Sequence, residues 1–105
     1  MTGESEAPQI ESPQVESPQA EALQIEALQT ALAAEHAAVY VYGALGGRTS
    51  RAETPELSAA VSSAYASHRA RRDLLTSEVV DLGGEPVAAE AAYDVPGRLE
   101  TPEQV

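Results

Sequence analysis

The sequence contains no cysteine, lysine, tryptophan or phenylalanine, and its single methionine is Met1. Without cysteine the chain forms no disulfide bond, iron–sulfur cluster or zinc–thiolate site. Positive charge is also scarce, because six arginines face 17 acidic residues and leave a net charge of −11 over 105 residues. This excess of acid argues against nucleic acid and against an anionic membrane surface as partners.

Long hydrophobic runs are missing as well. No apolar stretch approaches the roughly 18 residues that a membrane-spanning helix needs. The segment before Ala22 carries five glutamates and no basic residue, which is the reverse of a secretory signal. We therefore expect a cytoplasmic protein that does not associate with membranes.

Alanine dominates what is present, with twenty copies, whereas aromatic residues make up 4% of the chain and are all tyrosine. Alanine is the strongest helix former because it loses no side-chain entropy on folding. The composition therefore predicts an all-α fold. Small side chains bury little area, at about 25 cal/mol per Å², so close helix packing or a partner must supply the remaining stability.

The first third of the chain contains a repeat with a five-residue period. Proline heads its first three units and leucine the next two, which begin at Pro8, Pro13, Pro18, Leu23 and Leu28. Proline at this spacing removes backbone donors and clashes with the preceding turn, so the early units are not helical. We predict a disordered acidic Pro/Gln/Glu leader over residues 1–20 and a helical domain over residues 21–105. The boundary between the disordered leader and the first helix is expected between Ser17 and Ala22, with Pro18 as the first helical position.

Apolar residues between Pro18 and Leu45 recur three and four positions apart, which is the spacing of one helix face. They are Ile25, Leu28, Leu32, Val39 and Tyr42. Two glycines follow, Gly46 and Gly47, and glycine commonly ends a helix. The first helix is therefore expected to end near Leu45.

A second helix is predicted from Pro55 to about Leu82. Thr54 is its expected N-cap, and Pro55 occupies the first helical position. The apolar face of this helix consists of Leu57, Val61, Tyr65, Leu75, Val79 and Leu82. The glycines at 83–84 are expected to end it.

The rest of the chain predicts less regular structure. A short helical turn is expected across Ala88–Tyr93, and Thr101 followed by Pro102 has the pattern of a third helix start. Two long helices with a short connection form an antiparallel hairpin, which buries one stripe on each helix and is seldom stable alone. We therefore expect half of a four-helix bundle, either completed by a second copy or truncated from a longer domain.

Parts of the sequence resemble an uncharacterised ferritin-like family found mainly in actinobacteria. The similar stretches are Ala31–Gly43, His68–Asp73 and Gly83–Ala89, with Ala92 and Tyr93. The resemblance spans about residues 22–103. It implies a ferritin-like bundle of four helices, of which this chain holds the first two.

Glu35 and His68 are the candidate metal ligands, with iron or manganese as the possible metal. A di-iron bundle uses one glutamate from each of two helices and a Glu-x-x-His motif from each of the others. Tyr65 replaces the glutamate three residues before His68, and neighbouring arginines would repel a cation. We therefore favour no cofactor and a buried polar layer, in which Glu35 pairs with His68 or Arg72 across the hairpin and fixes the helix register.

Two further clusters each have a functional and a structural interpretation. Tyr40, Tyr42 and Tyr65 could form a redox set, but core aromatic residues with hydroxyls at a wet edge are more common. The arginines within Arg69–Arg72 could bind a phosphate or an acidic partner, although nearby acids and the acidic leader can neutralise them. No catalytic residue is indicated, because the sequence has no nucleophile turn and no phosphate-binding loop.

Three functions remain open. The favoured one is a ferritin-like domain with a structural or interaction role and without catalysis. The second is a metal-binding oxidoreductase or metal-storage bundle, assembled by self-association around Glu35 and His68. The third is a helical module that docks onto another helical protein.

Overall fold

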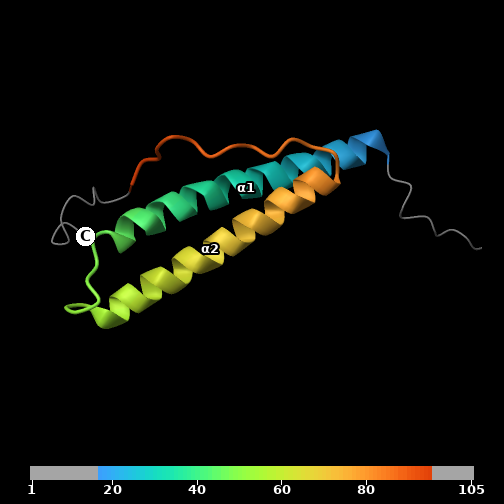
Figure 1. Cartoon of the computed structure of the whole chain (residues 1–105). Helices are drawn as coiled ribbons and strands as arrows, with labels where there is room; N and C mark the ends of the chain where they lie inside the picture. The colour runs from blue at the N-terminus through green and yellow to red at the C-terminus, as the bar shows by residue number, and fades with distance from the viewer. Residues whose placement is uncertain (1–16, 96–105) are drawn as a thin grey trace, which may run out of the picture.

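The computed structural model describes residues 17–95. Two long helices dominate this part of the chain: α1 spans Pro18–Gly46 and α2 spans Pro55–Asp81. They pack against each other in antiparallel directions (Figure 1). The expected all-α hairpin is confirmed. Residues 1–16 of the leader predicted to be disordered over residues 1–20, and the third helix predicted to start at Thr101, lie outside the described residues, whereas Pro18–Ala20 already belong to α1.

Local sequence explains where α1 begins and ends. Ser17 is the N-cap, and its hydroxyl accepts a 3.0 Å hydrogen bond from the backbone N–H of Ala20. Pro18 occupies the first helical position, where its missing N–H would have no intrahelical partner anyway. At the other end, Gly47 keeps a right-handed φ of −71°, and its N–H still bonds to the carbonyl of Gly43. α1 therefore ends without a left-handed glycine.

The start of α2 differs from the expectation for Thr54. The hydroxyl of Thr54 makes no capping hydrogen bond to the helix. It donates to the carbonyl of Ser50 at 3.0 Å and accepts from the N–H of Ser50 at 3.2 Å. Thr54 thus occupies the predicted N-cap position, and its carbonyl accepts the first helical bond from Ser58 N–H, but its side chain satisfies backbone groups of the turn between the helices instead of the helix.

Two glycines control the end of α2. Gly83 has a φ of 88°, a left-handed conformation that glycine adopts without steric cost. Gly84 then passes close to both helices: a Cβ atom there would lie 3.0 Å from Val79 Cγ1 and 3.1 Å from Ile25 Cγ2. A larger residue would therefore have to displace these two methyl groups by a few tenths of an ångström, and at this point the chain turns back along α1.

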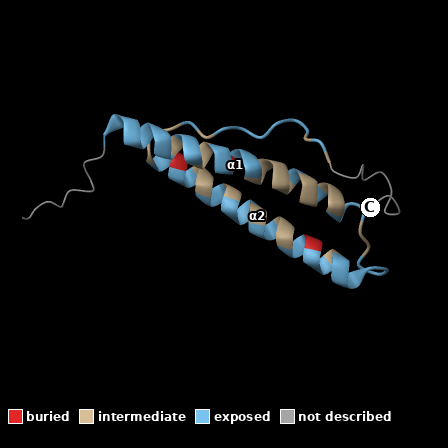
Figure 2. Ribbon diagram, turned by 180° about the vertical axis from the view of Figure 1, so that it is seen from behind, coloured by how far each residue is buried: buried red, intermediate tan, exposed pale blue. Residues whose placement is uncertain are grey.

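The core is a narrow seam between the two helices. Among the described residues only Leu32, Val61 and Val79 are buried, and Figure 2 shows how little of either helix is covered. Leu57 was expected on the same apolar face as Val61, but it is 54% exposed. It lies in the first turn of α2, at the end where the two helices diverge (Figure 1), so α1 does not cover it.

Residues 84–95, called the strap below, run along α1 in an extended conformation (Figure 1). The short helix predicted across Ala88–Tyr93 is therefore wrong. Backbone groups of the strap bond to side chains instead: Val87 N–H donates to the Gln29 amide oxygen, and Glu90 N–H donates to the Tyr93 hydroxyl.

Three side chains of α1 hold the strap. Gln29 donates to the carbonyl of Glu85 at 2.6 Å and accepts from Val87 N–H at 2.8 Å, much as a neighbouring strand would. His36 Nε2 donates to the Val87 carbonyl at 3.0 Å. The rings of Tyr40 and Tyr93 meet edge to face, with centroids 5.6 Å apart. The strap therefore covers one flank of α1.

Both helices carry charged residues along their length. Glu21, Glu26 and Glu35 lie in α1, and seven charged side chains lie in α2. Within residues 17–95, neither helix has the length and apolar character needed to cross a membrane.

Candidate ion-pair site

The two helices are joined at mid-length by a hydrogen-bonded pair, Glu35 on α1 and His68 on α2. The imidazole Nδ1–H of His68 donates to Glu35 Oε1 at 2.6 Å. The side chains are 16% and 21% exposed, respectively. The structure thus brings together the two residues singled out as candidate ligands. The polar layer was expected to be buried, but it is only half-buried, since no polar residue in the described part of the chain is buried.

Arg71, and not Arg72, is the third member of this cluster. Its Nε–H donates to Glu35 Oε2 at 3.1 Å, and its Nη2 lies 3.0 Å from His68 Nδ1. Because Nδ1 carries the hydrogen donated to Glu35, the second contact brings two donors together beside the Glu35 carboxylate. Arg72 was expected to pair with Glu35, but its Nε–H donates to Asp73 at 3.0 Å, so that expectation is wrong.

The pKa of Glu35 reflects these neighbours. Desolvation by the surrounding helices raises the pKa of this carboxyl group. Hydrogen bonds from His68 and Arg71, together with their positive charge, outweigh desolvation and lower the pKa below its ordinary value of 4.5. Glu35 is therefore held as a carboxylate at neutral pH.

The three tyrosines considered as a redox set each pack against a different neighbour. The Tyr42 ring stacks on the His68 imidazole, with centroids 5.2 Å apart and an interplanar angle of 17°. Tyr65 lies beneath the Arg69 guanidinium, whose central carbon is 5.5 Å from the ring centroid. Tyr40 instead contacts the strap. Each tyrosine thus supports a different neighbour, and Tyr42 holds the His68 ring in position for Glu35.

The residues of this cluster do not fit a metal ion. No group of three or more His, Asp or Glu side chains that could hold a metal occurs within residues 17–95. Both carboxylate oxygens of Glu35 already accept hydrogen bonds, one from His68 and one from Arg71. A cation at this point would also meet the Arg71 guanidinium. The geometry is that of a hydrogen-bonded bridge between the two helices.

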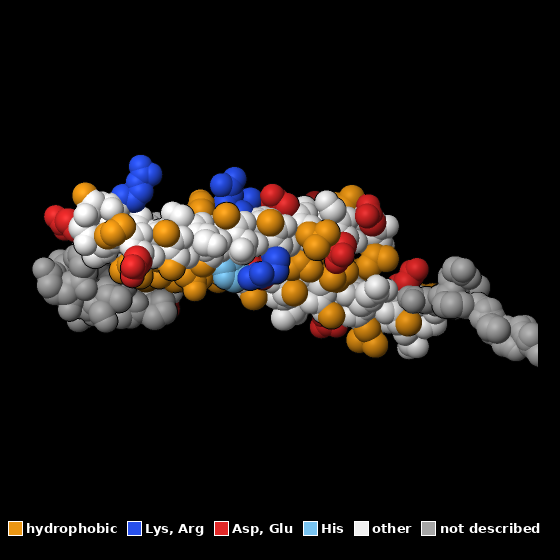
Figure 3. Space-filling view, turned by 90° about the horizontal axis from the view of Figure 1, so that it is seen from below, with side chains coloured by type: hydrophobic (Ala, Val, Ile, Leu, Met, Phe, Trp, Pro, Cys, Tyr) orange, Lys and Arg blue, Asp and Glu red, His pale blue; other side chains and the backbone are white. Residues whose placement is uncertain are grey.

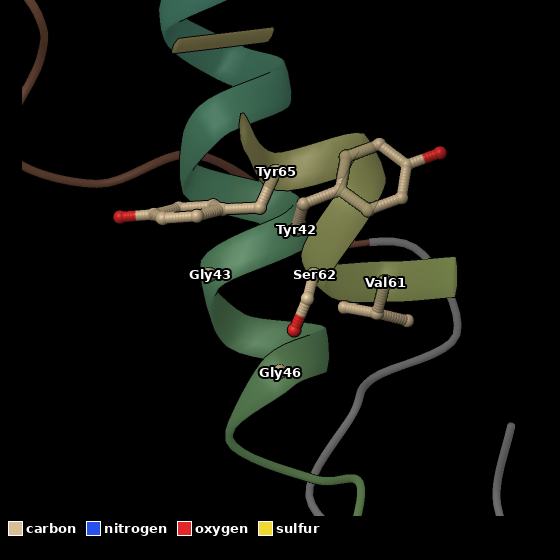
Figure 4. Close-up of a pocket in the computed structure, with 6 residues that line it drawn as sticks. All are labelled: Tyr42, Gly43, Gly46, Val61, Ser62 and Tyr65. Carbon is tan, nitrogen blue, oxygen red and sulfur yellow. The ribbon is translucent and has the colours of Figure 1, made fainter. Parts of the chain in front are cut away.

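A small pocket of about 210 Å³ lies in the fork between the diverging helices. Gly43 and Gly46 line it from α1, and Val61, Ser62 and Tyr65 line it from α2, with Tyr42 beside them (Figure 4). The Ser62 hydroxyl points between the helices, whereas the two tyrosine hydroxyls point to opposite sides (Figure 4). A second pocket lies at the other end of the seam, where Leu28, Glu78 and Leu82 are among the residues that line it. The seam is thus incompletely filled at both ends.

One face of the hairpin leaves this seam open. Figure 3 shows hydrophobic side chains gathered along the seam, interrupted near its middle by histidine and arginine. At mid-length of the hairpin, the side chains of His68 and Arg71 are in contact. The strap contacts α1 through Gln29 and His36, and His36 is displaced about 100° around the helix from Glu35. The strap and the ion pair therefore lie on different flanks of α1.

Several of these residues carry no recognisable signal in the sequence. Gln29 is one of several glutamines in the five-residue repeat, and only the returning strap gives it a role. Arg71 lies one position away from the apolar seam pattern, which is why the pattern points to Arg72. His36 follows Glu35 directly, but a lone histidine gives no indication of the carbonyl that it binds.

The fold and the site define a helical-hairpin domain whose two helices are joined at mid-length by a Glu–His–Arg cluster. The chain belongs to the family described as a domain of unknown function (DUF4439), whose model matches residues 27–105. The match includes the Glu35–His68 pair, most of α1, all of α2 and the strap. No curated protein and no solved structure matches the chain.

Proposed function

We propose that the chain is one half of a ferritin-like four-helix bundle, and that it acts as a structural module by pairing with a second copy of itself. The small core carries this proposal. Only three side chains are buried among the described residues. Helical hairpins normally need two more helices to cover the rest of the seam.

The side chains beside the seam support a second helix pair as the missing cover. A row on α2, called the open row below, has alternating spacings of three and four residues and therefore forms one helix face. The open row comprises Leu57, Ala60, Ala64, Ser67, Arg71 and Leu74. Leu57 and Leu74 are 54% and 58% exposed, although both are large apolar side chains. The alanines between them would allow a partner helix to approach closely.

A second copy is the partner that best fits this surface. The strap already covers another flank of α1, which leaves the face with the open row free for packing. Two identical hairpins joined by a twofold axis present the same face to each other and close after two copies. The central Glu35–His68 pair would then lie inside the assembly, with its charges already balanced. Cytoplasmic location and a ferritin-like origin belong to this proposal.

Molar mass and helicity measured together test the proposal. Light scattering is expected to give twice the 11.0 kDa mass of one chain. Circular dichroism is expected to show helix content that falls on dilution, because dissociation exposes the seam. Leu74→Glu should convert the assembly to monomer. Leu23→Glu introduces the same charge at another exposed leucine of 66% exposure, on α1, and should leave the mass unchanged.

Three results would contradict the proposal. A stably helical monomer at all concentrations would show that the narrow seam is sufficient by itself. A dimer that responds equally to both leucine substitutions would place the contact elsewhere. If the isolated chain is poorly helical and monomeric, a different helical protein becomes the partner to seek.

A further inference from the structure

Charges on α2 are arranged so that the helix complements itself. Arg71, Leu74 and Glu78 follow one another at spacings of three and four residues and share one face of the helix. Arg71 is 54% exposed, and only its Nε–H is used by Glu35. The Glu78 side chain makes no ion pair or hydrogen bond with any residue in the described part of the chain, and Glu78 is exposed. An exposed cation and an exposed anion thus lie two turns apart.

A twofold axis converts this spacing into contacts between chains. When two copies of a helix pack antiparallel about such an axis, residues equally far from it on opposite sides become neighbours. Arg71 and Glu78 lie equally far from a point between Leu74 and Leu75. Each lies about 5 Å from that point along the helix, given a rise of 1.5 Å per residue. Arg71 of each copy therefore meets Glu78 of the other.

We infer that α2 packs antiparallel against α2 of a second copy, with the axis at Leu74, and that two reciprocal Arg71–Glu78 ion pairs fix this register. This inference rests on the proposed self-pairing and adds its geometry. Leu74 would meet its own image at the axis, which covers the exposed apolar side chain nearest the centre of the contact.

The same axis suits α1. Glu35 is level with Arg71 in the hairpin because their side chains bond to each other. Counting from this pair in opposite directions, the point between Leu74 and Leu75 is level with Ala31 and Leu32 of α1. Ala31 is exposed, so at the axis the small methyl group of Ala31 would face Ala31 of the second copy, and the two α1 helices could approach closely. Glu35 lies away from the axis and does not face its own image.

An axis at the middle of α2 is disfavoured by charge. That axis would pass near His68 and would gather Arg69, Arg71 and Arg72 of both copies around one point. Like charges placed opposite each other destabilise an interface and suppress that arrangement. The axis at Leu74 instead places the positive segment of each copy against the negative segment of the other, which contains Glu78 and Asp81.

Charge reversal at Glu78 tests the register. Glu78→Arg replaces both ion pairs of the dimer by repulsion, and we expect the dimer dissociation constant to rise about tenfold or more in sedimentation experiments. Glu26→Arg is the matched control, because it makes the same charge change at an exposed site nine residues from Glu35, on the opposite side of α1. This control is expected to leave the dissociation constant within about twofold of the unmodified chain.

Rescue distinguishes a specific ion pair from a general charge effect. The double variant Arg71→Glu/Glu78→Arg restores opposite charges across the axis and should regain most of the lost affinity. An equimolar mixture of the Arg71→Glu and Glu78→Arg chains should form a mixed dimer, although each chain alone dimerises weakly. Circular dichroism on each variant verifies folding, because Arg71→Glu also removes a donor from Glu35.

The outcomes separate the inference from the proposed function. A dimer that tolerates Glu78→Arg as well as Glu26→Arg overturns this register but leaves self-pairing intact. A monomeric unmodified chain overturns both. If Arg71→Glu prevents folding, the comparison of Glu78→Arg with Glu26→Arg still decides the register, since neither glutamate has a partner within the described residues.

Discussion

Removing the carboxylate of Glu35 should destabilise the hairpin by about 2 kcal/mol. Hydrogen bonds to charged groups contribute about 1.5–3 kcal/mol each when they are shielded from water. The bond to His68 meets that condition best, because both side chains are largely covered. The bond to Arg71 contributes less, in the range of about 0.2–1 kcal/mol for exposed pairs, because the arginine is half exposed.

Thermal unfolding followed by circular dichroism measures this effect. For a domain of this size, 1 kcal/mol shifts Tm by about 4–8 °C, so Glu35→Ala should lower Tm by about 8–16 °C. All variants must be compared at one protein concentration, because assembly raises the apparent stability. Glu26→Ala is the control: it removes an exposed carboxylate from the same helix and should change the free energy of unfolding by less than about 0.5 kcal/mol.

A double-mutant cycle identifies the arginine that acts on Glu35. Combining Glu35→Ala with Arg71→Ala should give an interaction energy of about 0.5 kcal/mol or more, since the two side chains bond directly. Combining Glu35→Ala with Arg72→Ala should give additive effects, because Arg72 bonds to Asp73. Coupling to Arg72 and none to Arg71 would refute the assigned geometry. An unchanged Tm for Glu35→Ala would refute the energetic role of the cluster.

Three further perturbations have expected results of defined direction. Because folding lowers the pKa of Glu35, the carboxylate contributes its full stabilisation above about pH 4.5, and this contribution is lost as the pH falls through the pKa of the folded state. The Tm of Glu35→Gln should therefore decline less steeply on acidification than the Tm of the unmodified chain. Gly84→Ala places a Cβ 3.0 Å from Val79 Cγ1 and should cost about 1–3 kcal/mol through overpacking, measurable by chemical denaturation. Gln29→Ala removes both amide contacts to the strap, so hydrogen exchange at the Val87 amide should accelerate by about tenfold, whereas unchanged protection would show that the strap is held by other contacts.

The helices could be predicted from sequence because their ends depend on local chemistry. Pro18 cannot sit in a helix interior but suits its first turn, and α1 begins there. Gly83 adopts a left-handed conformation, and α2 ends two residues before it. The antiparallel pairing follows from two apolar stripes joined by a connection too short for any other arrangement. The Glu35–His68 contact follows from the same stripes, because both residues interrupt them at mid-length.

The strap could not be predicted because its structure is set by another element. Residues 88–93 are rich in alanine, and local propensity favours helix there. In the structure Gln29 and His36 supply hydrogen bonds to the strap backbone from α1, more than fifty residues earlier in the chain. Contacts at that separation leave no periodic trace in a single sequence. Tertiary hydrogen bonds therefore override the local preference.

Glu35 bonds to Arg71 and not to the predicted Arg72, and the physical reason applies to other helical seams as well. An arginine in the middle of an apolar seam must turn its guanidinium outward to reach water, and Arg72 does so by bonding to Asp73. An arginine one position earlier starts at the flank, where its long side chain can reach across to the facing helix while its end stays solvated. Arg71 does this, binding Glu35 while remaining half exposed. The partner of an acid on a helical seam should therefore be sought at flanking positions, one residue from the apolar stripe. A flanking arginine also keeps donors free for a second acid, which is the property that the Arg71–Glu78 pairing between copies requires.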